Sequence, residues 1–139
     1  MKPAVFDASV AVRAFIRGPG YRQAEAAIDR YAMVAPALIV TEVANAIWKY
    51  HRRGDLDRAT SLDVIRRFAV YPELRPDLTL QPEALQIACE QDHPVYDCLY
   101  IALARREGLP LISADKRLLT LARDRLGLQT ISLDDINPS

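Results

Sequence analysis

The sequence predicts a single α/β domain, residues 1–139, with a short-stranded and mainly parallel sheet covered by helices on both faces. Short apolar runs alternate with longer amphipathic segments along the chain, as in successive βαβ units. A length of 139 residues suits one domain and is sufficient to bury a hydrophobic core. No linker, internal repeat or low-complexity segment divides the chain.

The sequence of the first half of the chain predicts two strands and four helices. Gly18-Pro19-Gly20 breaks one helix, Pro36 fits the first turn of another, and Gly54 ends that helix. We expect a strand at 4–6, a helix capped by Ser9 that reaches 17, a helix at 21–30, a strand at 32–35, a helix with Pro36 in its first turn that ends at 53, and a helix at 56–70.

The second half continues the alternation, and prolines open its helices. Pro82 and Pro94 each stand at the beginning of a helical pattern, and Gly108 ends the second of these helices. We expect a strand or extended connection at 77–80, helices from 82 and from 94, a strand at 109–113, a helix around 118–122 that ends near Gly127, and a last strand at 128–131.

Composition excludes several classes of protein. No apolar run approaches the ~18 residues of a membrane span, and the apolar stretch at the N-terminus is too short for a signal peptide, so we expect a cytoplasmic location. Two cysteines and two histidines without a C-x-x-C pair disfavour a zinc site. The formal net charge of zero gives no overall attraction to nucleic acid, although local charge matters more than the total.

Two acids, Asp7 and Asp115, each follow a predicted strand. Ligands of open parallel sheets bind beyond the carboxyl ends of the strands. If the strands before Asp7 and Asp115 are neighbours, both carboxylates lie over the same edge of the sheet. The alternative for Asp115 is an ordinary helix cap, and the same alternative applies to Ser9 and Ser113.

Two further acids, Glu42 and Asp97, lie in helices that are otherwise largely apolar. Glu42 and Asn45 are spaced i and i+3, so they share a helix face, and Asn45 can orient the carboxylate. The alternatives are a solvent-facing stripe with Thr41 for Glu42 and a favourable helix dipole for Asp97. Clustered carboxylates need compensation, and Mg²⁺ or Mn²⁺ bound by hard oxygen ligands is the simplest form of it.

Four segments together resemble the PIN domain family, and within it the VapC-type toxin ribonucleases. The order, the spacing and the chain length match, and the motifs span nearly the whole sequence. No Gly-rich phosphate loop or G-x-S-x-G motif suggests other chemistry. The segments are Val5-Phe6-Asp7-Ala8-Ser9-Val10, Glu42-Val43-Ala44-Asn45-Ala46, Tyr96-Asp97 continuing to Ala104, and Leu111-Ile112-Ser113-Ala114-Asp115-Lys116-Arg117.

The resemblance implies an α/β/α sandwich and an Mg²⁺- or Mn²⁺-dependent endoribonuclease that cleaves single-stranded or loop RNA. It further implies the toxin of a type II toxin–antitoxin pair, a homodimer, and neutralisation by a small antitoxin protein. A PIN-like RNA-processing nuclease and a non-catalytic RNA- or protein-binding domain are the alternatives. By motif, the catalytic and metal-binding acids are Asp7, Glu42, Asp97 and Asp115, with Ser9, Asn45 and Ser113 as supporting groups.

The surfaces for RNA and for partners are predicted more broadly. Positive side chains can contact RNA phosphates, and we consider the Tyr31–Trp48 region and the Leu56–Phe68 helix for protein contacts. Core packing and plain solvation are the alternative roles of these residues. The candidates for phosphate contact are Arg13, Arg17, Arg52, Arg53, Lys116 and Arg117.

Overall fold

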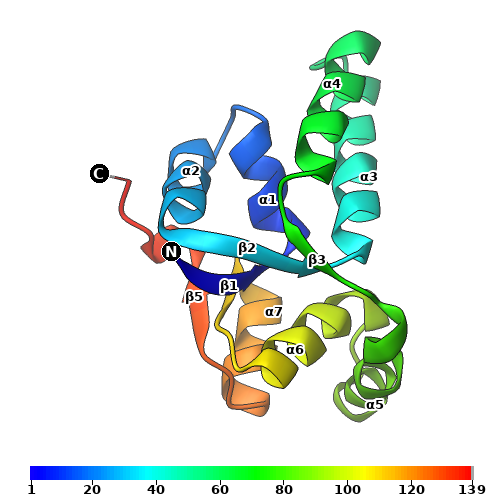
Figure 1. The fold of residues 1–139 in the computed structure, drawn as a ribbon, viewed down its shortest axis with the longest axis vertical. Coiled ribbons are helices and arrows are strands. Elements are labelled where there is room, and N and C mark those ends of the chain that lie inside the picture. The colour runs from blue at the N-terminus through cyan, green and yellow to red at the C-terminus, as the bar shows by residue number, and fades with distance from the viewer. Residues whose placement is uncertain (139) are drawn as a thin grey trace.

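The chain forms a five-stranded parallel sheet between two layers of helices in a computed structural model that describes residues 1–138 (Figure 1). The strand order is β3-β2-β1-β4-β5, which confirms the predicted α/β/α fold with a parallel sheet. The strands are β1 (Lys2–Phe6), β2 (Tyr31–Pro36), β3 (Glu73–Arg75), β4 (Leu111–Ser113) and β5 (Thr130–Ser132).

Helices α1 to α4 lie on one side of the sheet and α5 to α7 on the other (Figure 1). Helices α3 and α4 pair as a hairpin that extends beyond the sheet in that view. The helices are α1 (Ala8–Phe15), α2 (Tyr21–Arg30), α3 (Leu38–Arg52), α4 (Arg58–Ala69), α5 (Gln81–Gln91), α6 (Val95–Glu107) and α7 (Lys116–Thr120), with one π-helical turn at Leu121–Arg125 and short 3₁₀ turns at Leu78–Leu80 and Leu133–Asp135.

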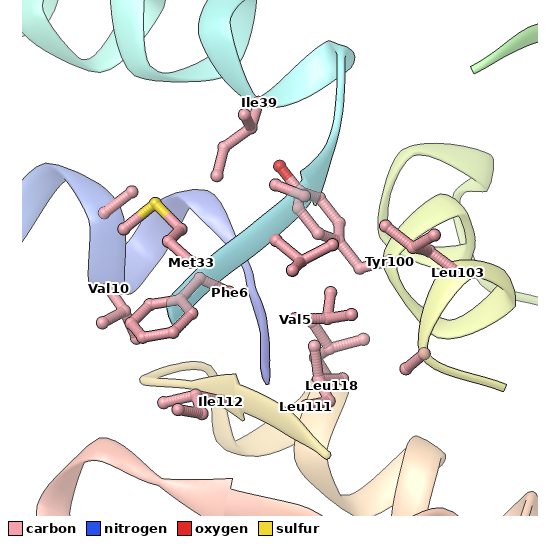
Figure 2. Close-up of a cluster of buried hydrophobic side chains, with 14 of the residues drawn as sticks. Val5, Phe6, Val10, Met33, Ile39, Tyr100, Leu103, Leu111, Ile112 and Leu118 are labelled. Carbon is pink, nitrogen blue, oxygen red and sulfur yellow. The ribbon is translucent and has the colours of Figure 1, made fainter. Parts of the chain in front are cut away.

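Alternation along the strands sends side chains into both layers. Val5 pairs with Leu111 and Phe6 with Ile112 in the β1–β4 register, and all four are fully buried. Successive strand residues point to opposite faces, so each pair serves a different layer. Figure 2 shows Phe6 and Ile112 on the side of Val10, and Val5 and Leu111 on the side of α6.

Four sequence predictions about the elements are wrong. Asp7, rather than Ser9, caps α1, and the helix ends at Phe15. Pro36 ends β2 and does not lie in the first turn of α3. Residues 77–80 contain a 3₁₀ turn. The strand at Glu73–Arg75 was missed because it is a three-residue edge strand without an apolar alternation.

Helix α3 is also less buried than its composition indicates. It buries only Ile39, Val43 and Ile47, while Trp48 is 49% exposed. The many apolar residues of α3 therefore do not mean burial on all sides. Much of the surface of α3 remains in contact with solvent. The alternative of a solvent-facing stripe holds for Thr41 and Asn45, which are exposed, whereas Glu42 is half-buried.

In the part of the chain that the structure describes, no helix is long and apolar enough to cross a membrane.

Candidate active site

Asp7 lies where the order of the parallel strands reverses. It directly follows β1, and β1 is adjacent to β4. The chain winds from β1 to β2 and β3 on one side and places β4 and β5 on the other. A crevice at such a reversal point is the usual ligand site of open α/β sheets. The predicted proximity of the segments after β1 and β4 is therefore confirmed.

The carboxylate of Asp7 is buried and receives three hydrogen bonds. Ser9 Oγ donates to Oδ1 at 2.5 Å, Ser113 Oγ donates to Oδ2 at 2.6 Å, and the backbone N–H of Val10 donates to Oδ1 at 3.4 Å. Burial raises the pKa of Asp7 to about 6, although these donors oppose the rise and the charge of Asp97 adds to it. Asp7 can therefore change its charge near neutral pH.

The two serine hydroxyls also join the start of α1 to the end of β4 and the residues that follow it. Ser9 Oγ accepts from the backbone N–H of Ala114 at 3.0 Å, and Ser113 Oγ accepts from that of Asp115 at 2.9 Å. Each hydroxyl thus accepts from a backbone amide and donates to Asp7. Both serines therefore lie directly beside Asp7, and their supporting role in the reaction stays a prediction.

Glu42 lies on the first turns of α3 and is held by a tyrosine from the opposite layer. Tyr100 Oη donates to Glu42 Oε1 at 2.5 Å. Burial raises the pKa of Glu42, the Tyr100 hydroxyl opposes this, and the charges of Asp97 and Asp77 raise it further. Burial and then the charge of Glu42 raise the pKa of Tyr100 well above its usual range, so this hydroxyl keeps its proton.

Asp97 lies in the first turn of α6, where the helix dipole favours an acid. Its Oδ2 is 2.7 Å from Nε2 of His93, a buried residue in the turn that precedes the helix. Because a carboxylate only accepts, the ring nitrogen is the donor. The charge of Asp97 affects both Asp7 and Glu42, so these three acids share one electrostatic environment.

Asp115 is the N-cap of α7, as the alternative interpretation of this residue predicts. It is exposed, and its Oδ1 accepts from the backbone N–H groups of Arg117 at 3.0 Å and Leu118 at 3.3 Å at the start of α7. The Ser113 hydroxyl connects the Asp115 backbone to Asp7. A role in metal binding for Asp115 stays a prediction.

Asn45 is exposed and lines a hollow of about 440 Å³ beside Glu42. The partner that the structure gives Glu42 is Tyr100, and the proposed orientation of Glu42 by Asn45 stays a prediction. Sequence reasoning missed His93 and Tyr100. The four-residue spacing from His93 to Asp97 is a usable signal, because such pairs share a helix face; Tyr100 was interpreted as part of an apolar stripe.

Within residues 1–138, no three His, Cys, Asp or Glu side chains stand close enough together to hold an ion as they are arranged. Ionised carboxylates repel one another, and each of them loses solvation on burial. Burial is the largest cause of the raised pKa of Asp7 and of Glu42, and the charge of Asp97 adds to it in both. The site is a loose group of acids whose charge is only partly offset by neutral hydrogen-bond donors.

Comparisons with known proteins agree with this geometry. The model of the PIN domain family matches residues 4–124, and the chain belongs to this family, in its VapC-type branch. It is 30% identical to Ribonuclease VapC3 of Pyrobaculum aerophilum over 118 residues, which is 82% of this chain and 90% of the relative. It is 29% identical to Exonuclease VapC9 of the same organism over 94 residues, 68% of this chain and 70% of the relative.

Solved structures show the same fold. The crystal structure of PAE2754 from Pyrobaculum aerophilum has a TM-score of 0.70 at 24% identity and covers 96% of this chain and 92% of its own. The crystal structure of VapBC2 from Rickettsia felis, bound to a DNA fragment from its promoter, has a TM-score of 0.62 at 12% identity, with coverage of 93% and 97%. At these identities the likeness concerns the fold alone.

Proposed function

We propose that the protein is an Mg²⁺- or Mn²⁺-dependent endoribonuclease that cleaves single-stranded or loop RNA in the cytoplasm as the toxin of a type II toxin–antitoxin pair. Membership of the PIN domain family and the likeness to a relative named as a ribonuclease support a nuclease. The observation that carries the proposal is the buried Asp7 at the strand reversal, with Asp97 close enough to affect its pKa.

The donor set suits a hard divalent cation. Carboxylate oxygens are the ligands that Mg²⁺ and Mn²⁺ prefer. Asp7, Glu42 and Asp97 would hold the ion, and Asp115 would join them through the oxygen that does not cap α7. A bound cation of this kind activates a water molecule and stabilises the charge of a phosphodiester in the transition state.

The residues of the chain prepare the acids for that role. The hydroxyls of Ser9 and Ser113 hold both oxygens of Asp7 and lower its pKa against the effect of burial. This favours the ionised form that a cation needs. The hydroxyl of Tyr100 donates to Glu42, and the ring N–H of His93 donates to Asp97.

A positively charged groove begins next to the acids and offers a path for RNA. It measures about 920 Å³, lies between α1, α3 and α4, and shares Ala46 and Lys49 with the hollow beside Glu42. Arg13, near its start, donates to the backbone oxygen of Ser9 at 2.6 Å. Phosphate contacts from such side chains position a nucleic acid without reading its sequence. The basic lining residues are Arg13, Arg17, Lys49, Arg53 and Arg67.

The same groove is the surface that an antitoxin would cover. Its walls include the apolar side chains of Phe15, Leu56 and Val64 beside the basic ones, so an amphipathic segment with acidic groups fits it. On the other side of the α3–α4 hairpin, the exposed Trp48 and Leu62 flank an apolar hollow of about 240 Å³. This second surface is our candidate for the homodimer contact.

The test is cleavage of a structured RNA by the purified protein with Mg²⁺, with Mn²⁺ and with EDTA. We expect cleavage with either ion and none with EDTA. Asp7→Asn and Asp97→Asn should each abolish cleavage and growth inhibition while the fold is retained by circular dichroism. Full activity of both variants would refute the proposal, and RNA binding without cleavage by the wild type would favour a binding domain.

Growth inhibition separates a toxin from a processing nuclease. A toxin arrests growth when it is expressed alone, and growth resumes when a small partner protein that neutralises the toxin is expressed with it. Cleavage in vitro without growth arrest in vivo would retain the nuclease and remove the toxin role.

A further inference from the structure

Tyr100 and His93 each hydrogen-bond one acid of the candidate site, although neither belongs to the acid set. Tyr100 is three residues after Asp97 on α6, and His93 is four residues before it. Tyr100 Oη lies 2.5 Å from Glu42 Oε1, and His93 Nε2 lies 2.7 Å from Asp97 Oδ2. One helix and the turn before it therefore supply both contacts.

The Tyr100 hydroxyl is unusual for its position in the core. The side chain is 1% exposed and lies in the core between α6 and the sheet, where a phenylalanine would fill the same space without a polar atom. Figure 2 shows its oxygen at the end of the ring that is remote from α6. A polar group so deeply buried is retained at a cost unless it is hydrogen-bonded, and here its partner is Glu42.

The contact restricts a flexible side chain. Glutamate has three rotatable bonds, and Glu42 is only half-buried on a helix beside an open hollow. A donor anchored in the core limits its rotamers and so reduces the entropy that binding an ion would cost. Oε1 is engaged by Tyr100, and Oε2 is left for another interaction.

His93 restricts Asp97 in a comparable way. Its ring is buried, and it directly follows Asp92, which ends α5 with a positive φ of 51°. The N–H of His93 donates to the oxygen of Ala88 at 3.2 Å. A histidine held at both backbone and ring is suited to orient a carboxylate, as partners of metal ligands commonly do.

We propose that Tyr100 and His93 are positioning residues for the cleavage reaction, which orient Glu42 and Asp97 so that the two acids hold the divalent cation together. The inference rests on the proposed function, because it concerns the acids of that site. It adds two side chains that act through the acids and do not touch the RNA.

The first experiment compares Tyr100→Phe with the wild type. Mn²⁺ binding is measured by calorimetry without RNA, and kcat and KM are measured on the same RNA with saturating Mn²⁺. Loss of such a partner weakens metal affinity or activity by roughly 10- to 100-fold, so we expect at least tenfold weaker Mn²⁺ binding. The value of kcat should fall while KM for RNA stays within about twofold.

The matched control is Tyr21→Phe, since Tyr21 Oη donates to Glu25 on the exposed surface at 2.9 Å. It should bind Mn²⁺ and cleave RNA as the wild type does. A double-mutant cycle with Glu42→Gln tests the route of the effect. If Tyr100 acts through Glu42, Tyr100→Phe should change Mn²⁺ affinity little in the Glu42→Gln background. Independent, additive losses would overturn this route.

His93 is tested by a pair of variants that differ in one donor. Gln retains an N–H at about the place of Nε2, whereas Leu fills the space without one. We expect His93→Leu to weaken Mn²⁺ binding about tenfold and His93→Gln to recover most of the loss. If both variants lose the same Mn²⁺ affinity, or if the loss of affinity only parallels a lower melting temperature, His93 has a structural role and the proposal for it is overturned.

Measurements on the wild type distinguish a failure of the proposed function from a failure of the positioning role of Tyr100 and His93. If it neither binds Mn²⁺ nor cleaves RNA, the proposed function fails and the positioning role fails with it. If the wild type binds and cleaves but Tyr100→Phe and His93→Leu match it in Mn²⁺ affinity, the positioning role alone is refuted.

Discussion

The charge of Asp7 depends on a balance between burial and two serine hydroxyls. Its side chain is almost inaccessible to water, which raises its pKa to about 6 in spite of the donors. A divalent cation binds only the ionised form, so the metal affinity of the site should decrease as the pH falls below about 6. At the residue scale, the site is thus tuned by neutral neighbours.

We expect the contribution of Asp7 to stability in EDTA to fall as the pH rises. The pKa of about 6 in the folded protein lies above the ordinary 3.8, so the folded state binds the proton more tightly in that window. Stability is highest below the unfolded pKa, and about 3 kcal/mol is lost as the pH rises through the folded pKa. Urea unfolding of the wild type and Asp7→Asn from pH 4 to 7 measures the loss; a pH-independent difference between them would contradict it.

Ser113→Ala should shift the pH dependence of metal binding upward. The Ser113 hydroxyl is the donor that lowers the pKa of Asp7 most, so its removal raises that pKa further. Mn²⁺ titrations between pH 5.5 and 8.5 should show affinity lost at a higher pH than in the wild type, by about one pH unit. Ser61→Ala is the control, because the Ser61 hydroxyl lies on α4 and donates to the backbone oxygen of Asp57, away from Asp7.

At the scale of elements, an aromatic contact joins helix α4 to α1, in addition to the packing of α3 against α1 and β2. Phe68 of α4 is fully buried and meets Phe15 of α1 edge-to-face, with 5.2 Å between ring centroids. Phe15 also meets Tyr71 at 5.3 Å. Because α3 carries Glu42, this contact supports the position of an acid as well as the stability of the fold.

Phe68→Ala should therefore lower both stability and cleavage. Truncation of a fully buried phenylalanine costs about 3–5 kcal/mol, and α4 loses its aromatic contact with Phe15 of α1. The free energy of unfolding from urea titrations measures the first effect, and kcat at a temperature where the variant is folded measures the second. Val70→Ala, at a position that is 85% exposed, should stay within about 0.5 kcal/mol of the wild type. A loss in Phe68→Ala no larger than in this control would contradict the assignment.

At the scale of the whole molecule, a bound cation would connect strand β1 with helices α3 and α6, which carry or precede the candidate acids. Asp7 follows β1, Glu42 lies on α3 and Asp97 on α6, so an ion held by all three would link the two helix layers across the edge of the sheet. Ligands that bind only the folded state stabilise it by mass action. The protein should thus be more stable when the ion is present.

Mn²⁺ at about 100 times its dissociation constant should stabilise the protein by about 2.7 kcal/mol, which differential scanning calorimetry records as a higher melting temperature. EDTA should reverse the increase, and Asp7→Asn should show none of it. KCl at equal ionic strength serves as the control for general salt effects, because Ca²⁺ also binds carboxylate oxygens. An equal increase in wild type and Asp7→Asn would place ion binding elsewhere on the surface.

The alternation of strands and helices and the four candidate acids of the site can be predicted from the amino-acid sequence. Asp7, Glu42, Asp97 and Asp115 were identifiable because acids are rare next to buried strands and in apolar helices. Helix ends were readable to within a few residues because glycine and proline act locally, as at Gly108 and Pro82.

The neighbours of each strand and the contacts of each acid are properties of the folded chain and cannot be read from local sequence. The adjacency of β1 and β4 depends on how the whole sheet is assembled, and so do the long-range bonds from Ser113 to Asp7 and from Tyr100 to Glu42. Burial distinguishes two acids that both cap a helix, since Asp7 is buried and Asp115 is exposed. Local sequence carries propensity and pattern, whereas burial and pairing between residues some sixty to a hundred positions apart arise only when the chain is folded.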